Sequence, residues 1–220
     1  MNWNSHYAIS ILPGLLAGVW ETVIVTAFAA AIALGGGLAL AVLGQVGGRF
    51  ARVAVRTMVD LCRGVPILVA LYFGFYALPQ AGVLLSGFQV GVLVLGVIYA
   101  AYCSEVYRGG LISISGDIGD ACFALGLPAR TTWGKVLIPL TVRRSLPALL
   151  NYVIVLLKQS AFLFAIGVPV LLARAQLDGY ESFRYVEPYT LAGGLYIALN
   201  VPLVILLRLY ERRKLRQGVV

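Results

Sequence analysis

The stretch RGGLISISGDIGDACFALGLPARTTWGKVLIPLTVRR, residues 108–144, decides how this chain is organised. It is a polar interruption between two long apolar segments, about Val90–Tyr107 before it and about Leu146–Leu172 after it. Long apolar segments joined by a short charged loop are typical of helices that cross a membrane. The chain is therefore expected to pass through a bilayer on both sides of this loop.

Local signals within the loop predict two short helices. Asp117 can cap the first helix, with Asp120 at the third position inside it, in the manner of a capping box. Gly126 is a helix terminator, Pro128 suits the first turn of a second helix, and Pro139 is expected to end that helix. The apolar side chains that would make this pair a docking element are Phe123, Leu125 and Trp133. These signals fit a packed intracellular loop equally well, so both interpretations stay open at this point.

The composition agrees with a membrane protein. Across 220 residues the mean hydropathy is +0.91, 60% of the residues are hydrophobic and only 12% are charged. A soluble domain of this length needs more polar surface, so most residues must face lipid or other buried helices. The net charge of +8 comes without the basic and aromatic surface that nucleic acid requires, so nucleic acid is not an expected partner.

Five segments are apolar enough to span a bilayer, which takes roughly 20 residues. They are about Leu15–Leu43, Pro66–Leu78 extended backward through Met58–Val65, Val90–Tyr107, Leu146–Leu172 and Tyr189–Leu209. No soluble domain or internal repeat separates them, so we expect one all-α transmembrane domain over residues 1–220. In the connection before the fifth segment, Val170–Leu177 is a candidate short interfacial helix.

Basic residues are distributed unevenly between the two sides of this arrangement. Of the 17 Lys and Arg residues, all but three lie in the connections after the first and third segments, or after the fifth; the exceptions are Lys158, Arg174 and Arg184. Since basic loops stay in the cytoplasm, the N-terminus is expected outside and the C-terminus inside. Termini on opposite sides require an odd number of spans, which five satisfies.

The chain lacks the residues for chemistry of its own. The nearest approach to the nucleotide-binding pattern G-x-x-x-x-G-K-[ST] is Gly134-Lys135, but Ala129 and Val136 replace the first Gly and the Ser or Thr. His6 is the single histidine, the three cysteines fit neither a zinc site nor a disulfide framework, and no carboxylates are convincingly paired. We therefore expect no catalytic residue, no metal site and no cofactor in this chain.

Two ionisable groups fall inside predicted spans, where charge is costly and marks a partner or a pathway. Because an amino acid carries both an ammonium and a carboxylate, Glu105 and the run Lys158, Gln159 and Ser160 are candidate substrate contacts. A structural role is the alternative, with Glu105 paired to Arg108 at i,i+3 and Lys158 bonded to a backbone carbonyl.

The loop also resembles a known coupling motif. From Asp120 to Pro139 it reads D-A-C-x-x-x-G-x₉-V-x-I-P, which is similar to the E-A-A-x-x-x-G-x₉-I-x-L-P loop of ABC-importer permeases. The spacing is kept throughout, and the replacements are mild, including Asp120 for Glu and Cys122 for Ala.

Matches outside the loop narrow the resemblance to the polar amino acid permeases, the histidine, glutamine, arginine and opine group. The matching features are G-x-x-x-T at Gly18 and Thr22, R-G-[TV]-P at residues 63–66, A-Y-x-x-E-x-x-R-G-G at residues 101–110, and N…K-[DN]-[ST] at Asn151 and residues 158–160. Two departures stand out: Ser115, Asp117 and Ile118 replace the P-x-G-Q before the loop, and Gln159 replaces an acidic or Asn residue. Arg63 has a simpler interpretation as an anchor for lipid phosphate, which we favour over a substrate role.

The resemblance implies a type I ABC importer permease in the bacterial inner membrane that carries a polar amino acid or a related small zwitterionic solute. It implies a cytoplasmic coupling loop at about residues 109–142 that docks on an ATP-binding subunit dimer, where ATP and Mg would bind. A second permease subunit, identical or homologous, and an extracytoplasmic solute-binding protein are the other implied partners, with membrane lipid around them. The implied coupling residues are Asp120, Ala121, Cys122, Phe123, Gly126, Trp133 and Pro139.

Two rival classes are an ion-gradient-driven secondary transporter and an intramembrane enzyme. The first would need more intramembrane acidic groups, and the second would need a reactive cluster. Neither feature is visible in the sequence.

Overall fold

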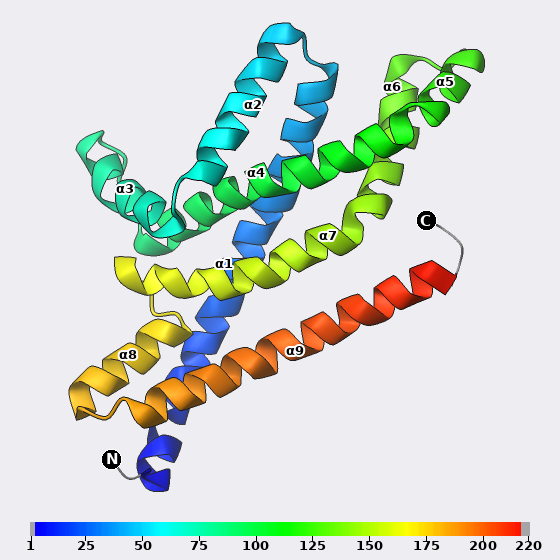
Figure 1. The fold of residues 1–220 in the computed structure, drawn as a ribbon. Coiled ribbons are helices and arrows are strands. Elements are labelled where there is room, and N and C mark those ends of the chain that lie inside the picture. Colours follow the sequence, from blue (N-terminus) through cyan, green and yellow to red (C-terminus); the bar gives the residue numbers. More distant parts are fainter. Residues whose placement is uncertain (1–2, 217–220) are drawn as a thin grey trace.

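The computed structural model describes residues 3–216, and every regular element in this part of the chain is helical (Figure 1). The elements are, in order, α1 (Ser5–Val46), α2 (Arg49–Gly64), α3 (Ile67–Gln80), α4 (Gly87–Ser115), α5 (Asp117–Ala124), α6 (Ala129–Thr131), η1 (Thr132–Leu137), α7 (Ile138–Gln159), η2 (Ser160–Ile166), α8 (Leu171–Ser182) and α9 (Val186–Arg216). Within residues 3–216, four helices are long and apolar enough to cross a membrane, or five if the bent pair α2–α3 counts as one span. The expected all-α membrane architecture is therefore confirmed at this level.

Helices α1 and α4 cross at close range because small residues line their contact. A side-chain carbon at Gly37 would come within 2.7 Å of Cys103 Cβ and 2.9 Å of the Ala100 carbonyl oxygen, and one at Gly96 would collide with Ile32. In membranes, close backbone approach gives dispersion contacts that larger side chains would prevent. The main core forms around this crossing, with Val25, Leu95 and Leu149 among its fully buried members.

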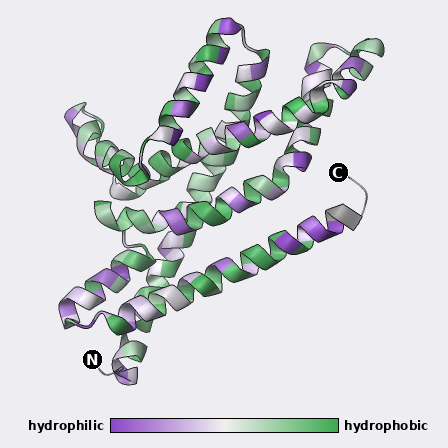
Figure 2. Cartoon of the chain, in the orientation of Figure 1, coloured by the Kyte–Doolittle hydropathy of each residue, from purple (hydrophilic) through white to green (hydrophobic). Residues whose placement is uncertain are grey.

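The second predicted span is wrong as a single straight helix. It is two helices, α2 and α3, bent by 102° at their junction. Val65 adopts an extended conformation with φ −88° and ψ 129°, because the ring of Pro66 disfavours a helical residue before it. Figure 2 shows hydrophilic residues along much of α2, whereas α3 is more uniformly hydrophobic.

The expected short helix before the last span is confirmed as α8, and it packs on the first half of α1. The Leu171 backbone N–H donates a 3.0 Å hydrogen bond to Thr22 Oγ1, which itself donates to the Gly18 carbonyl at 2.8 Å. A side-chain carbon at Gly18 would lie 2.8 Å from Leu171 Cα. The G-x-x-x-T pattern is thus the part of α1 on which the start of α8 packs. The glycine allows the close approach, and the threonine hydroxyl accepts a hydrogen bond from an N–H at the start of α8.

The fourth predicted span, Leu146–Leu172, also needs new limits. Helical backbone runs without a break from Ala129 to Ile166 and ends at Gly167, whose φ is +76°. Leu171 and Leu172 belong instead to α8. The helix passes close to α4, since a side-chain carbon at Gly110 would come within 2.4 Å of Ser145 Oγ.

The two ends of the molecule differ in what they carry. The N-terminal turn of α1 lies with α8 and the start of α9 at one end, and α5 and α6 lie at the other (Figure 1). Glu187 joins the first group, since its carboxylate accepts hydrogen bonds from the Asn4 backbone N–H at 3.0 Å and from Arg184 Nε at 3.1 Å. We call the opposite end, which carries α5, the α5 end.

Candidate functional site

The loop between α4 and α7 projects from the α5 end as a short helix and a tight turn. Helix α5 is followed by Gly126 in the left-handed conformation, with φ +67°. The Gly126 N–H bonds to the Phe123 carbonyl and the Leu127 N–H bonds to the Cys122 carbonyl, so the turn closes on the helix it ends. Glycine is favoured here because other residues resist positive φ. The predicted first helix and its terminator are both confirmed.

Two local details of the loop prediction are wrong. Asp117 is not the cap: Gly116 occupies that position without a side-chain hydrogen bond, and Asp117 and Asp120 both lie in the first turn of α5. There they still favour the helix, because negative charge complements its positive N-terminal end.

Pro139 does not end the second helix, which continues into α7. The preceding residues 132–137 form a π-helical turn, in which the Ile138 N–H bonds to the Trp133 carbonyl five residues back. A proline lacks an N–H and its ring clashes with the carbonyl four residues earlier, and the wider turn relieves both demands. The polar loop is consequently shorter than residues 109–142, since α4 also extends to Ser115.

The seven implied coupling residues divide by exposure. Phe123 is 87% exposed, and the neighbouring Leu125, the second predicted apolar knob, is 77% exposed. Cys122 is buried, and Trp133 packs half-buried against the core, so these two hold the loop to the body of the molecule rather than project from it. The remaining four are exposed: Asp120, Ala121, Gly126 and Pro139. Large exposed apolar side chains on a charged loop are typical of a contact with another protein.

Glu105 forms the ion pair that its spacing allows. Its carboxylate accepts hydrogen bonds from Arg108 Nε at 3.0 and 3.1 Å and from an Arg108 terminal nitrogen at 2.7 Å. Both side chains remain partly exposed. The structural alternative for Glu105 is therefore present in the fold, and its contact with substrate stays a prediction.

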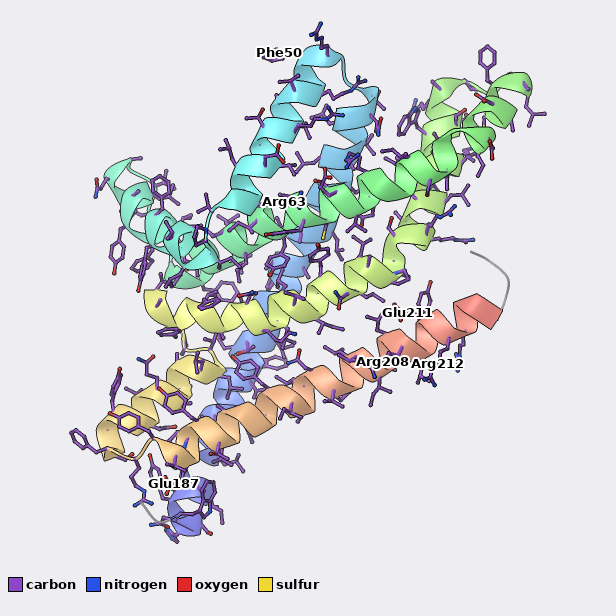
Figure 3. The ribbon with its side chains drawn as sticks, viewed as in Figure 1. Phe50, Arg63, Glu187, Arg208, Glu211 and Arg212 are labelled. Atoms are coloured by element: carbon purple, nitrogen blue, oxygen red, sulfur yellow. The ribbon has the colours of Figure 1, made fainter. Side chains whose placement is uncertain are left out.

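An aromatic cluster with an arginine lies where the α2–α3 bend meets α4 and α7. The rings of Tyr99, Tyr102 and Tyr152 lie 5.6–6.2 Å apart between centroids. The Arg63 guanidinium lies 5.3 Å from the centre of the Tyr102 ring, and the Tyr102 hydroxyl donates to the Arg63 carbonyl at 3.5 Å. Gln159 interacts with Tyr99 through its side chain. Figure 3 shows Arg63 between α2 and α4.

This cluster could not be found from spacing alone. The sequence places Tyr102 in one motif and Arg63 in another, 39 residues apart. The sequence shows that both motifs match the pattern of the same family, but that pattern does not say that the two residues touch. The bend at Val65-Pro66 is what brings the arginine over the ring.

The predicted run Lys158, Gln159 and Ser160 points in three directions. Lys158 is exposed, Gln159 is half-buried toward Tyr99, and Ser160 is fully buried and donates to the Leu157 carbonyl at 2.7 Å. Neighbouring helical residues differ by about 100° around the axis, so one cavity cannot receive all three. Glu105 lies six positions beyond Tyr99 on α4, roughly 9 Å along the helix.

Over the described part of the chain, residues 3–216, no group of three or more His, Cys, Asp or Glu residues could hold a metal ion. Cys103 and Cys122 are buried and Cys62 is half-buried, and all three are free thiols.

Comparison with known proteins identifies the family. Residues 31–216 match the family described as the binding-protein-dependent transport system inner membrane component. The chain belongs to this family, whose members form the membrane subunits of binding-protein-dependent transporters.

Relatives and structures make the class more specific. The chain is 32% identical to a probable amino-acid ABC transporter permease protein, y4tG, of Sinorhizobium fredii, over 99% of this chain and 94% of that one. It is 31% identical to the glutamine transport system permease protein GlnP of Escherichia coli, over 86% of this chain and 89% of that one. Its fold matches the crystal structure of an amino acid ABC transporter with histidines at a TM-score of 0.88 and 29% identity, covering 97% of this chain and all of that one. These findings favour an ABC transporter permease over an ion-gradient-driven secondary transporter.

Proposed function

We propose that this chain forms the membrane pathway for a polar amino acid, or a related small zwitterionic solute, in an ATP-driven importer. In the proposed assembly two permease subunits, identical or homologous, stand on two ATP-binding subunits and receive solute from an extracytoplasmic binding protein. The ATP-binding subunits hold ATP and Mg, and this chain is not catalytic. The N-terminus faces outward and the C-terminus faces the cytoplasm of a bacterial inner membrane.

The observation that carries the coupling role is the exposed end of α5. Phe123 and Leu125 stand in solvent at the end of the molecule where basic residues also gather. Covering these side chains with a partner protein would stabilise the complex by about 25 cal/mol per Å² of apolar area removed from water. A groove on the ATP-binding subunit would supply that cover and transmit closure to α4 and α7, between which the loop is held.

The aromatic cluster supports an amino acid as the transported solute. The sequence favours Arg63 as a lipid anchor, but its guanidinium lies over the Tyr102 ring, and in this proposal it pairs with the carboxylate of the solute. The faces and hydroxyls of Tyr99, Tyr102 and Tyr152 suit an ammonium. Gln159 adds a neutral amide at the same level. An α-amino acid carries both groups, and its identity beyond that class depends on side chains supplied by the second subunit and the binding protein. Contact of the solute with Glu105, Lys158 and Ser160 stays a prediction.

Coupled ATP hydrolysis tests this function. The complex of this chain with its ATP-binding subunits is reconstituted in proteoliposomes, and loaded binding protein is added to measure ATPase stimulation and amino acid uptake. Gly126→Val is expected to reduce both at least tenfold, because φ +67° resists a β-branched side chain and the strain redirects α5. Gly119→Ala is the matched control, since Gly119 lies inside α5 with no heavy atom within 4 Å of an added side-chain carbon.

Two outcomes would contradict the proposal. Normal stimulated ATPase and uptake with Gly126→Val would remove the loop from coupling. Uptake by the purified chain alone, driven by a proton gradient, would make the protein a secondary transporter.

A further inference from the structure

A small, open pocket lies at the α5 end, between the last turns of α1, the middle of α2 and the end of α4. Its polar lining consists chiefly of Arg52, Arg56, Glu105, Arg108 and Gln45, and Ile112 forms part of its edge. The aromatic cluster around Tyr102 lies outside this lining.

The pocket carries excess positive charge. Glu105 is already engaged by Arg108 through the bidentate contact described above. Within residues 3–216, neither Arg52 nor Arg56 forms a salt bridge. Arg52 Nε donates a 3.3 Å hydrogen bond to the Gly44 carbonyl, which fixes the guanidinium at the pocket wall. With three arginines against one glutamate, the pocket suits an anion that can accept several hydrogen bonds.

Exposed apolar side chains lie on the helices α2 and α4 that form the pocket. Ile112, on its edge, is 56% exposed, and Val53 on α2 is exposed to the same extent. Helix α2 also exposes Leu61 and, at its tip, Phe50, which points away from the helix bundle in Figure 3. A free phosphate ion would use none of this surface, whereas a lipid would lay its acyl chains along it.

We propose that this pocket binds the headgroup of an anionic phospholipid from the leaflet at the α5 end. The phosphodiester accepts hydrogen bonds from Arg52 and Arg56, and the chains lie against Ile112 and the exposed apolar side chains of α2. Basic pockets between membrane helices favour anionic headgroups because charge pairing and burial of apolar surface act together. The arginines of α2 then hold that helix at the lipid surface beside α4. This inference needs only the membrane fold, so it stands or falls separately from the transported solute.

Native mass spectrometry of the detergent-purified permease in complex with its ATP-binding subunits tests the proposal. Phosphatidylglycerol and phosphatidylcholine of equal chain length are titrated, and retained lipid is counted. We expect saturable binding of phosphatidylglycerol at least tenfold tighter than that of phosphatidylcholine. The double change Arg52→Gln with Arg56→Gln should remove this preference, and Arg52→Lys with Arg56→Lys should retain most of it.

The matched control is Arg212→Gln, because Arg212 is an exposed arginine on α9 (Figure 3), away from the pocket. Glycerol phosphate at millimolar concentration is added as a competitor, to distinguish binding of a lipid headgroup from binding of a small phosphate ligand. Unchanged phosphatidylglycerol preference in the double Gln variant would overturn the proposal, as would equal loss with Arg212→Gln. Full displacement of the lipid by glycerol phosphate would assign the pocket to a small phosphate ligand instead.

Discussion

The hydroxyl of Thr22 is expected to hold α8 in place, and Thr22→Val tests this. Valine keeps the size and branching of threonine and removes only the hydroxyl. Thr22 is fully buried, and its Oγ1 is the acceptor for the Leu171 N–H at 3.0 Å. After the change, that N–H at the start of α8 has no acceptor at the Thr22 position.

The expected loss follows from the cost of an unpaired buried donor, which is about 1–3 kcal/mol. The Gly18 carbonyl loses the Thr22 hydroxyl as a donor, but it keeps its backbone hydrogen bond within α1 and so stays paired. In a chain of this size 1 kcal/mol corresponds to roughly 2–4 °C in thermal midpoint. A loss of about 2 kcal/mol therefore lowers the midpoint of the purified protein by roughly 4–8 °C.

Thr26→Val is the matched control, one turn further along the same helix. Thr26 is also buried, but in the described part of the chain its hydroxyl acts as a donor, to the Thr22 carbonyl at 2.7 Å. Removing it leaves no buried donor unpaired, so its midpoint should stay within about 2 °C of the unaltered protein. Both variants are compared by thermal unfolding in the same detergent. Equal midpoints for the two variants would show that the Thr22–Leu171 bond contributes nothing to seating α8.

Two further predictions concern the end opposite α5. Burial, reinforced by the charge of Glu181 and opposed by Arg174, raises the pKa of Asp178, and one of its carboxylate oxygens is buried without a partner among the described residues. When the pKa of a carboxyl is raised in the folded state, the stability that it contributes is present at low pH and is lost as pH rises through that pKa. Asp178→Asn should therefore be more stable than the unaltered protein at pH 7, and the difference should close toward pH 4. Thermal unfolding measured across this pH range tests the prediction. Glu187→Gln should lower the midpoint at pH 7, because the 1% exposed carboxylate accepts from both the chain's N-terminal turn and Arg184. Retention of the midpoint in Glu187→Gln, or a pH-independent effect of Asp178→Asn, would contradict these assignments.

Much of the loop between α4 and α7 could be predicted because its signals are local. Positive φ at Gly126 follows from the terminator pattern, and α5 follows from its short apolar run between polar ends. The prediction that Asp117 caps α5 was wrong because Gly116 and Asp117 are neighbouring candidates for the N-cap position, and the path of the chain out of α4 decides between them. The prediction that Pro139 ends the second helix was wrong because a π-helical turn removes the clash that normally ends a helix at proline.

The sequence by itself determined that this chain is an all-helical membrane protein with a polar loop between its third and fourth apolar segments, because apolar length, charge bias and motif spacing are properties of the chain order. It also pointed to the Gly18–Thr22 pair, without saying what the pair touches. Only the tertiary structure decided that Thr22 seats α8, that Arg63 lies over Tyr102 and that Arg52 and Arg56 share a pocket with Glu105. These contacts join residues far apart in the chain, and they depend on where helices cross and on the 102° bend between α2 and α3, which no local pattern specifies.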